Sequence, residues 1–118
     1  MKRKKNSKTA FTGAPNTYEL GHVRGVMEND FHAIKAGSHV LVSALPNKNI
    51  ITIEELEKTP QGQFYWTSAI QGVSLSLMEG LVIQTQNSVI RIRAKNFLEA
   101  INFRRLLLAK MEEFRRPA

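Results

Sequence analysis

The stretch NSVIRIRAKNFLEAINFRR, residues 87–105, joins a strand pattern to a helix pattern and decides how the whole chain is interpreted. Its segment SVIRIRA alternates apolar and polar residues, which predicts a strand with one buried face. Asn96, followed three residues later by Glu99, is a helix-capping pair, and a helical apolar period then continues to about Phe114. The sequence therefore predicts a strand that leads directly into the longest helix, at the C-terminal end.

A strand period of two precedes this stretch and begins at Gln63, which predicts four strands in this part of the chain. The last two of them face each other across a two-residue turn at Gln86-Asn87. The turn sets apolar pairs opposite each other on a buried face: Ile83 with Ile90, and Leu81 with Ile92. The outer face then carries Val82, Gln84, Val89, Arg91 and Arg93.

The first half of the chain predicts shorter elements. Residues 17–27 fit a bulged strand, DFHAIKAG fits a short helix that ends at Gly37, and SHVLVSAL fits a strand. Ile50 and Ile51 begin another strand, and Thr52 with Glu55 forms a capping pair for a second short helix. The sum is an α+β fold, a mixed and mainly antiparallel pseudo-barrel of about six strands and about three helices.

The composition predicts one soluble globular domain, because 118 residues with 42% hydrophobic and 23% charged content can bury a modest core. Residues 1–16 show no hydrophobic period and are expected to form a flexible basic arm, with the domain spanning residues 17–118. No apolar run is long enough for a bilayer and no secretory signal follows the basic start, so a cytoplasmic location is expected.

Charge is distributed unevenly along the chain, whose net charge is +7. Residues 1–8 carry a net +5, residues 9–87 carry −3, and residues 88–118 carry +5. A cationic arm and a cationic C-terminal third around an acidic middle are typical of proteins that bind nucleic acid or anionic membranes.

Catalytic chemistry is not indicated. His22, His32 and His39 do not have the spacing of metal ligands, and the acidic residues of TIEELE are explained by helix capping. The chain has no cysteine, and no phosphate-binding glycine loop or nucleophile motif occurs in it. We therefore expect no enzymatic activity, no metal and no cofactor.

The candidate RNA-binding residues are the cations of the arm and of the opening stretch: Lys2, Arg3, Lys4, Lys5, Lys8, Arg91, Arg93, Lys95, Arg104 and Arg105. Arg91 and Arg93 should point outward together, although the solvent face of any half-exposed sheet is also polar. Arg104 lies inside the expected apolar arc of the helix, so it must reach solvent, pair with an acid or face an anion. Tyr65 or Tyr18 could be exposed for base stacking, whereas Phe64 and Trp66 are expected in the core.

The run DFHAIKAGSHVLVSAL resembles the opening of PUA-like and ASCH-type domains, in which a Phe-x-x-Ile helix ends at a glycine and leads into a barrel strand. Phe31, Ile34 and Gly37 match that pattern, and His39 stands near the position of a basic residue common in ASCH domains. The length, the arm and the element count also resemble the PrgU-like family of Gram-positive conjugative-plasmid proteins. That resemblance implies a PUA-like fold, RNA binding and a regulatory role that restrains conjugation genes.

Two alternatives stay open. A run of antiparallel strands closed by one long C-terminal helix also describes a pleckstrin-like module, whose basic surface would meet anionic lipid. The chain could also be a protein-interaction domain whose arm only aids solubility. A pleckstrin-like domain is expected to carry basic residues in its first hairpin, and residues 38–51 hold one lysine, which favours nucleic acid.

Overall fold

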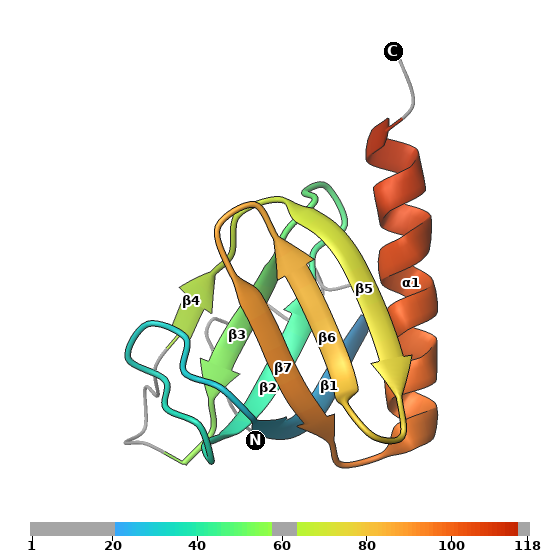
Figure 1. Ribbon diagram of the computed structural model, residues 1–118. Coiled ribbons are helices and arrows are strands. Elements are labelled where there is room, and N and C mark those ends of the chain that lie inside the picture. Colours follow the sequence, from blue (N-terminus) through green and yellow to red (C-terminus); the bar gives the residue numbers. More distant parts are fainter. Residues whose placement is uncertain (1–20, 58–63, 116–118) are drawn as a thin grey trace, which may run out of the picture.

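The computed structural model describes residues 21–57 and 64–115, and these form one antiparallel sheet of seven strands and one helix (Figure 1). The elements, in chain order, are β1 (Gly21–Met27), β2 (His39–Ala44), β3 (Ile51–Glu55), β4 (Phe64–Trp66), β5 (Ile70–Ser76), β6 (Gly80–Thr85), β7 (Val89–Ala94) and α1 (Phe97–Arg115). The expected arm, residues 1–16, lies outside the described residues.

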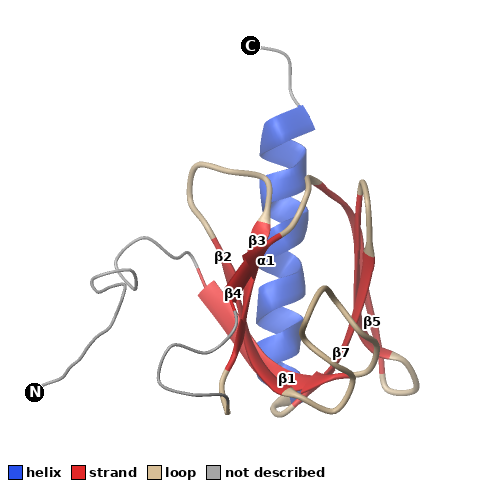
Figure 2. Cartoon of the chain, turned by 90° about the vertical axis from the view of Figure 1, so that its left-hand side faces the viewer, coloured by secondary structure: helices blue, strands red, loops and turns tan. Residues whose placement is uncertain are grey.

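Two meanders make up the sheet, whose strand order is β4-β3-β2-β1-β7-β6-β5. β1 to β4 form one meander and β5 to β7 the other, and the antiparallel pairing of β1 with β7 joins them. The sheet does not close, so β4 and β5 are its two edges. Figure 2 shows the two meanders, with α1 running between them. Helix α1 contacts β5, β1 and β7.

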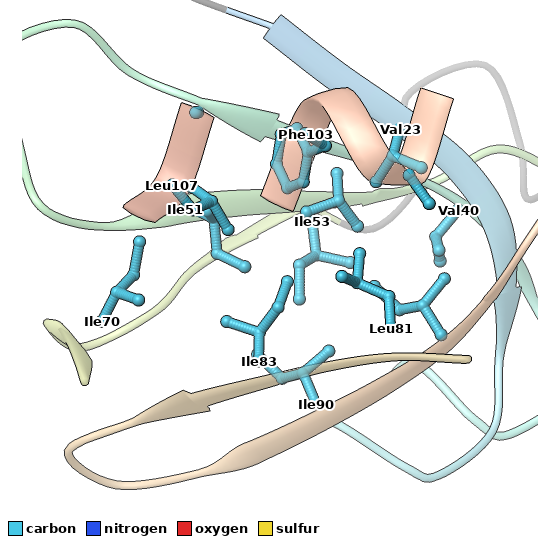
Figure 3. Packing of buried hydrophobic residues seen from close by; sticks show 14 of the residues in the cluster. Val23, Val40, Ile51, Ile53, Ile70, Leu81, Ile83, Ile90, Phe103 and Leu107 are labelled. Carbon is cyan, nitrogen blue, oxygen red and sulfur yellow. The ribbon is translucent and has the colours of Figure 1, made fainter. Parts of the chain in front are cut away.

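The core lies between the two meanders, on the face of the sheet that α1 covers. Val23, Ile53 and Ile83 are fully buried there, together with Phe103 and Leu107 from α1 (Figure 3). Because inner-face residues alternate with outer-face residues along each strand, the burial of these side chains fixes which face of β7 meets solvent.

The register predicted for the last hairpin is confirmed. Ile83 pairs with Ile90 and Leu81 pairs with Ile92, and all four side chains are fully buried. The predicted cap of the long helix is confirmed as well, because the Asn96 side-chain oxygen accepts a hydrogen bond from the Glu99 backbone N–H at 3.1 Å.

The prediction of a short helix at residues 30–37 is wrong. Phe31 and Ile34 exchange two backbone hydrogen bonds, of 2.8 and 2.9 Å, across a tight turn in which His32 has a positive φ of 54°. Asp30 accepts the Ala36 N–H at 2.8 Å and so closes the loop. A segment this short gains too few helical hydrogen bonds to offset helix nucleation, whereas the turn lets Phe31 and Ile34 enter the core.

The prediction of a second short helix, starting at Thr52, is also wrong, because residues 51–55 form strand β3. Its β-branched residues Ile51, Thr52 and Ile53 pair with β2, and Thr52 and Ile53 also pair with β4 on the other side. Glu55, expected in a capping pair, is instead 6% exposed on the inner face, and its Oε1 accepts no hydrogen bond from the described residues. The prediction of six strands and three helices therefore becomes seven strands and one helix in the described chain.

The buried face of α1 is narrower than the expected apolar arc. Phe97, Leu108 and Phe114 belong to the apolar period of the helix but are 41%, 37% and 47% exposed. The buried positions are Ala100, Phe103, Leu107, Lys110 and Met111. No helix in the described ranges is long and apolar enough to cross a membrane.

Candidate functional site

Four cations lie along the join between the two meanders, and we call them the cation row: Arg24, Arg91, Arg93 and Lys95. Arg91 and Arg93 are exposed on the outer face of β7, as the sequence predicts. Lys95 follows β7 directly, and its backbone N–H donates to the Arg24 carbonyl at 2.8 Å. The β1–β7 pairing therefore adds Arg24, which the sequence does not single out, because only this long-range pairing places β1 beside β7.

Arg93 is held by three neighbours. Its Nη1 donates to the Leu77 carbonyl at 3.0 Å and its Nη2 donates to the Met78 carbonyl at 2.9 Å. Its Nε lies 3.4 Å from a carboxylate oxygen of Glu28. This guanidinium gives two hydrogen bonds to the β5–β6 turn and two to Glu28. Four of its five N–H donors are therefore in use, and it adds positive charge to the row but few free donors.

The other three members of the row have free side chains. The side chains of Arg24, Arg91 and Lys95 are exposed, and none of them forms an ion pair or hydrogen bond with another described residue. The backbone of Arg91 is fixed on both sides: its N–H donates to Asn29 Oδ1 at 2.9 Å, and its carbonyl accepts the Glu28 N–H at 2.8 Å. A rigid strand thus presents unpaired cations to solvent.

The structure does not bring the remaining predicted cations to this row. Arg104 is half-buried and Arg105 is exposed on α1, which packs on the inner side of the sheet. Within residues 21–57 and 64–115 no carboxylate pairs with Arg104, so solvent contact explains its position in the helix. Lys2, Arg3, Lys4, Lys5 and Lys8 lie outside the described residues.

Lys110 is a buried cation that sequence reasoning missed. It is 2% exposed, donates to the Leu45 carbonyl, and its Nζ lies 5.1 Å from the centre of the Phe114 ring. Burial lowers the pKa of Lys110, and the nearby Glu113 carboxylate opposes that shift only in part. The helical spacing from Phe103 and Leu107 could have placed it on the buried face.

Tyr65 and Trp66, on β4, face the opposite ways from those considered in the sequence analysis. Tyr65 pairs with Ile53 and is partly buried against the core, with its ring stacked on His32 at 4.9 Å. Trp66 points the opposite way, is 53% exposed, and has Lys48 Nζ at 5.5 Å from its ring centre. Tyr65 and Trp66 lie on opposite faces as predicted, but it is Tyr65 and not Trp66 that meets the core.

A small hollow of about 180 Å³ lies where β1 meets the first turns of α1. Glu99 is one of the residues that line it: one carboxylate oxygen accepts the Arg24 N–H at 2.9 Å, and the other lies 3.9 Å from His22 Nε2. These bonds tie α1 to β1, which is a structural use of the acid. Among the described residues, no group of three histidine, aspartate or glutamate side chains is placed to hold a metal.

Comparison of the chain with known protein families, with curated proteins and with solved structures gave no match. The interpretation of the site therefore depends on the geometry of the cation row and on the surfaces that adjoin it.

Proposed function

We propose that the chain binds a phosphate-bearing polyanion through the cation row, with RNA as the partner that the sequence predicts. The observation that carries the proposal is the set of three exposed cations, Arg24, Arg91 and Lys95, which have no acidic partner among the described residues. Phosphate oxygens are the natural partners of such guanidinium and ammonium groups.

The strand geometry supports this proposal. Side chains two residues apart on a strand project from the same face about 6–7 Å from each other. Arg91, Arg93 and Lys95 follow that spacing, so one extended polyanion can meet several cations at once. The Glu28 carboxylate is paired with Arg93 and therefore opposes such binding less than a free acid would.

The test is a titration of the full chain with a single-stranded RNA at low and at physiological salt. Each phosphate that is neutralised releases counterions, so the affinity should fall steeply as salt rises. Arg91→Gln with Lys95→Gln should lower the affinity about tenfold or more and should reduce the salt slope by about two.

Arg105→Gln with Arg115→Gln is the matched control, because it removes the same charge from exposed positions on α1. The control should change affinity much less than the row variant does. Equal losses in the two variants would show that net charge alone attracts the polyanion, and an affinity without salt dependence would contradict polyanion binding.

The regulatory role stays a proposal. The PrgU-like resemblance implies that RNA binding restrains expression of conjugation genes, and the cation row is compatible with that role. The sheet is open and entirely antiparallel, so it is not the mixed pseudo-barrel that the sequence predicts. Sequencing of RNA that copurifies with the chain after crosslinking would test it. Recovery of transcripts without preference would leave no support for a regulator of particular genes.

An anionic membrane is the second candidate partner. Seven antiparallel strands followed by one C-terminal helix are the order of elements that the pleckstrin-like alternative expects. The first hairpin of the described chain, β1–β2, has its loop at residues 28–38, which carry Glu28, Asp30 and Lys35. Residues 38–51, in which the sequence analysis looks for basic residues, lie after that loop. This loop is not basic, and a lipid surface would have to meet the cation row instead.

A further inference from the structure

The most exposed large apolar side chains of the described residues lie on the β5–β6 turn. Leu77 is 78% exposed and Met78 is 86% exposed, and we call this pair the apolar tip. Leu98, which is 65% exposed, and Phe97, which is 41% exposed, begin α1 at the same end of the molecule (Figures 1 and 2). Exposed apolar side chains on one end of a protein usually mark a contact surface.

Several backbone polar groups of the apolar tip already form hydrogen bonds within the protein. The Leu77 and Met78 carbonyls both accept hydrogen bonds from Arg93, and the Glu79 N–H donates to the Ser76 hydroxyl at 3.0 Å. Gly80 completes the turn with a positive φ of 74°. Polar backbone groups that are already paired cost less to remove from water, so this turn can enter an apolar layer more cheaply than a solvated loop.

The cation row adjoins the apolar tip directly. Arg93 contacts the turn itself, and an added Cβ at Gly80 would lie 2.6 Å from the Ile92 carbonyl oxygen, so the turn packs closely against β7. Glu79 is the acid of the turn and opposes a negative partner. The unpaired cations Arg24, Arg91 and Lys95 outweigh that single charge.

We infer that the apolar tip inserts into the headgroup boundary of an anionic bilayer while the cation row meets lipid phosphates. This inference rests on the proposed function, because the same cation row binds the phosphates, and it takes the anionic membrane in place of RNA as the partner. A bilayer satisfies both halves of the surface at once, since apolar side chains enter its acyl boundary and nearby cations are attracted by anionic lipid. RNA would satisfy the cations, and Phe97 offers one ring for a base, but Leu77, Met78 and Leu98 would be left without an apolar partner.

The experiment measures sedimentation of the full chain with phosphatidylcholine vesicles that contain or lack phosphatidylserine. The parent should bind the anionic vesicles and should not bind the neutral ones. Leu77→Gln with Met78→Gln keeps every charge but removes the insertion, so its affinity for anionic vesicles should fall about tenfold or more. Leu108→Gln, at an exposed apolar position on α1, is the matched control and should bind like the parent.

A spectroscopic arm tests insertion itself. The chain has one tryptophan, so Trp66→Phe with Met78→Trp places the only indole on the apolar tip. Its emission should shift to the blue with anionic vesicles and should stay unchanged with neutral ones. Emission that stays unchanged with bound anionic vesicles would overturn insertion.

The remaining outcomes separate this inference from the proposed function. Vesicle binding that the tip variant retains, or a parent that binds RNA at physiological salt but no vesicles, overturns the bilayer inference and leaves the polyanion proposal intact. If Arg91→Gln with Lys95→Gln changes neither vesicle nor RNA binding, then the proposed function fails and the inference fails with it.

Discussion

At the scale of single residues, Lys110 shows how a charged side chain can belong to the core. Its stem lies on the buried face of α1 and its ammonium reaches the Leu45 carbonyl, so the helix gains a link to the end of the β2 strand. The cost is the desolvation of the ammonium, which lowers the pKa of Lys110. The stability of the protein should therefore depend on pH in a window set by this residue.

We expect Lys110→Met to change the free energy of unfolding by about 1 kcal/mol or less at neutral pH, because methionine keeps the stem and removes the desolvated charge. As pH rises from the lowered folded pKa toward the ordinary value of 10.5, the unfolded chain binds the proton more tightly than the folded one. The parent should therefore gain stability relative to the variant over that window. Urea unfolding at neutral pH and at about pH 11 measures the difference. A parent whose free energy of unfolding falls relative to that of the variant as pH rises would contradict the lowered pKa.

Arg91 and Arg93 also show what one residue's partners decide. Both were predicted to be free cations on the outer face of β7, and the structure confirms the face for both. Only Arg93 meets the β5–β6 turn and Glu28, because the neighbouring strand begins at Gly80 and places its turn within reach. Such a contact depends on where the β5–β6 turn lies relative to β7. The alternation of residues along β7 does not predict that position.

At the scale of elements, α1 depends on its first turn. Asn96→Ala should lower the free energy of unfolding by about 1 kcal/mol, because the Glu99 N–H loses its side-chain acceptor. Asn102→Ala is the control within the same helix, where alanine has the higher helix propensity and no cap is lost. It should leave stability unchanged or slightly raised. Thermal unfolding of both variants checks the pair, and equal destabilisation would argue against the cap.

The long elements could be predicted from the sequence and the short ones could not. The β6–β7 hairpin and α1 have strong local signals, a period of two with a tight turn and a capped apolar helix, and the structure confirms both. The segments at residues 30–37 and 51–55 carry helix-capping residues but are too short for capping to outweigh tertiary pairing. Ile51 and Ile53 enter the core from a strand, which a helix at this position would not allow.

At the scale of the whole molecule, the β1–β7 pairing holds the two meanders together and also creates the candidate site. Nothing local in the sequence indicates that residues near Arg24 meet residues near Lys95. The cation row was therefore predicted only in its β7 part, and the apolar tip was not predicted at all. Neighbouring strands and loops that are distant in sequence decide both surfaces.

Gly25 makes this pairing possible, because a Cβ there would lie 2.4 Å from the Arg93 carbonyl oxygen and 2.7 Å from an Ile92 methyl. Gly25→Ala should therefore lower the free energy of unfolding by about 2 kcal/mol or more. Gly72→Ala is the control, because its nearest neighbour would be 3.8 Å away. Urea unfolding of the two variants measures the difference. A Gly25 variant as stable as the control would mean that β1 and β7 can separate slightly at no cost.

The same pairing has a consequence for synthesis of the chain on the ribosome. β1 is the first described strand to emerge, yet its second neighbour, β7, and helix α1 are made after all the other described strands. The first meander must wait with Val23 and Val42 exposed until residues 89–111 leave the exit tunnel. Folding of the sheet is therefore expected to be completed only after α1 has left the exit tunnel, and a nascent chain stalled before α1 should remain sensitive to protease.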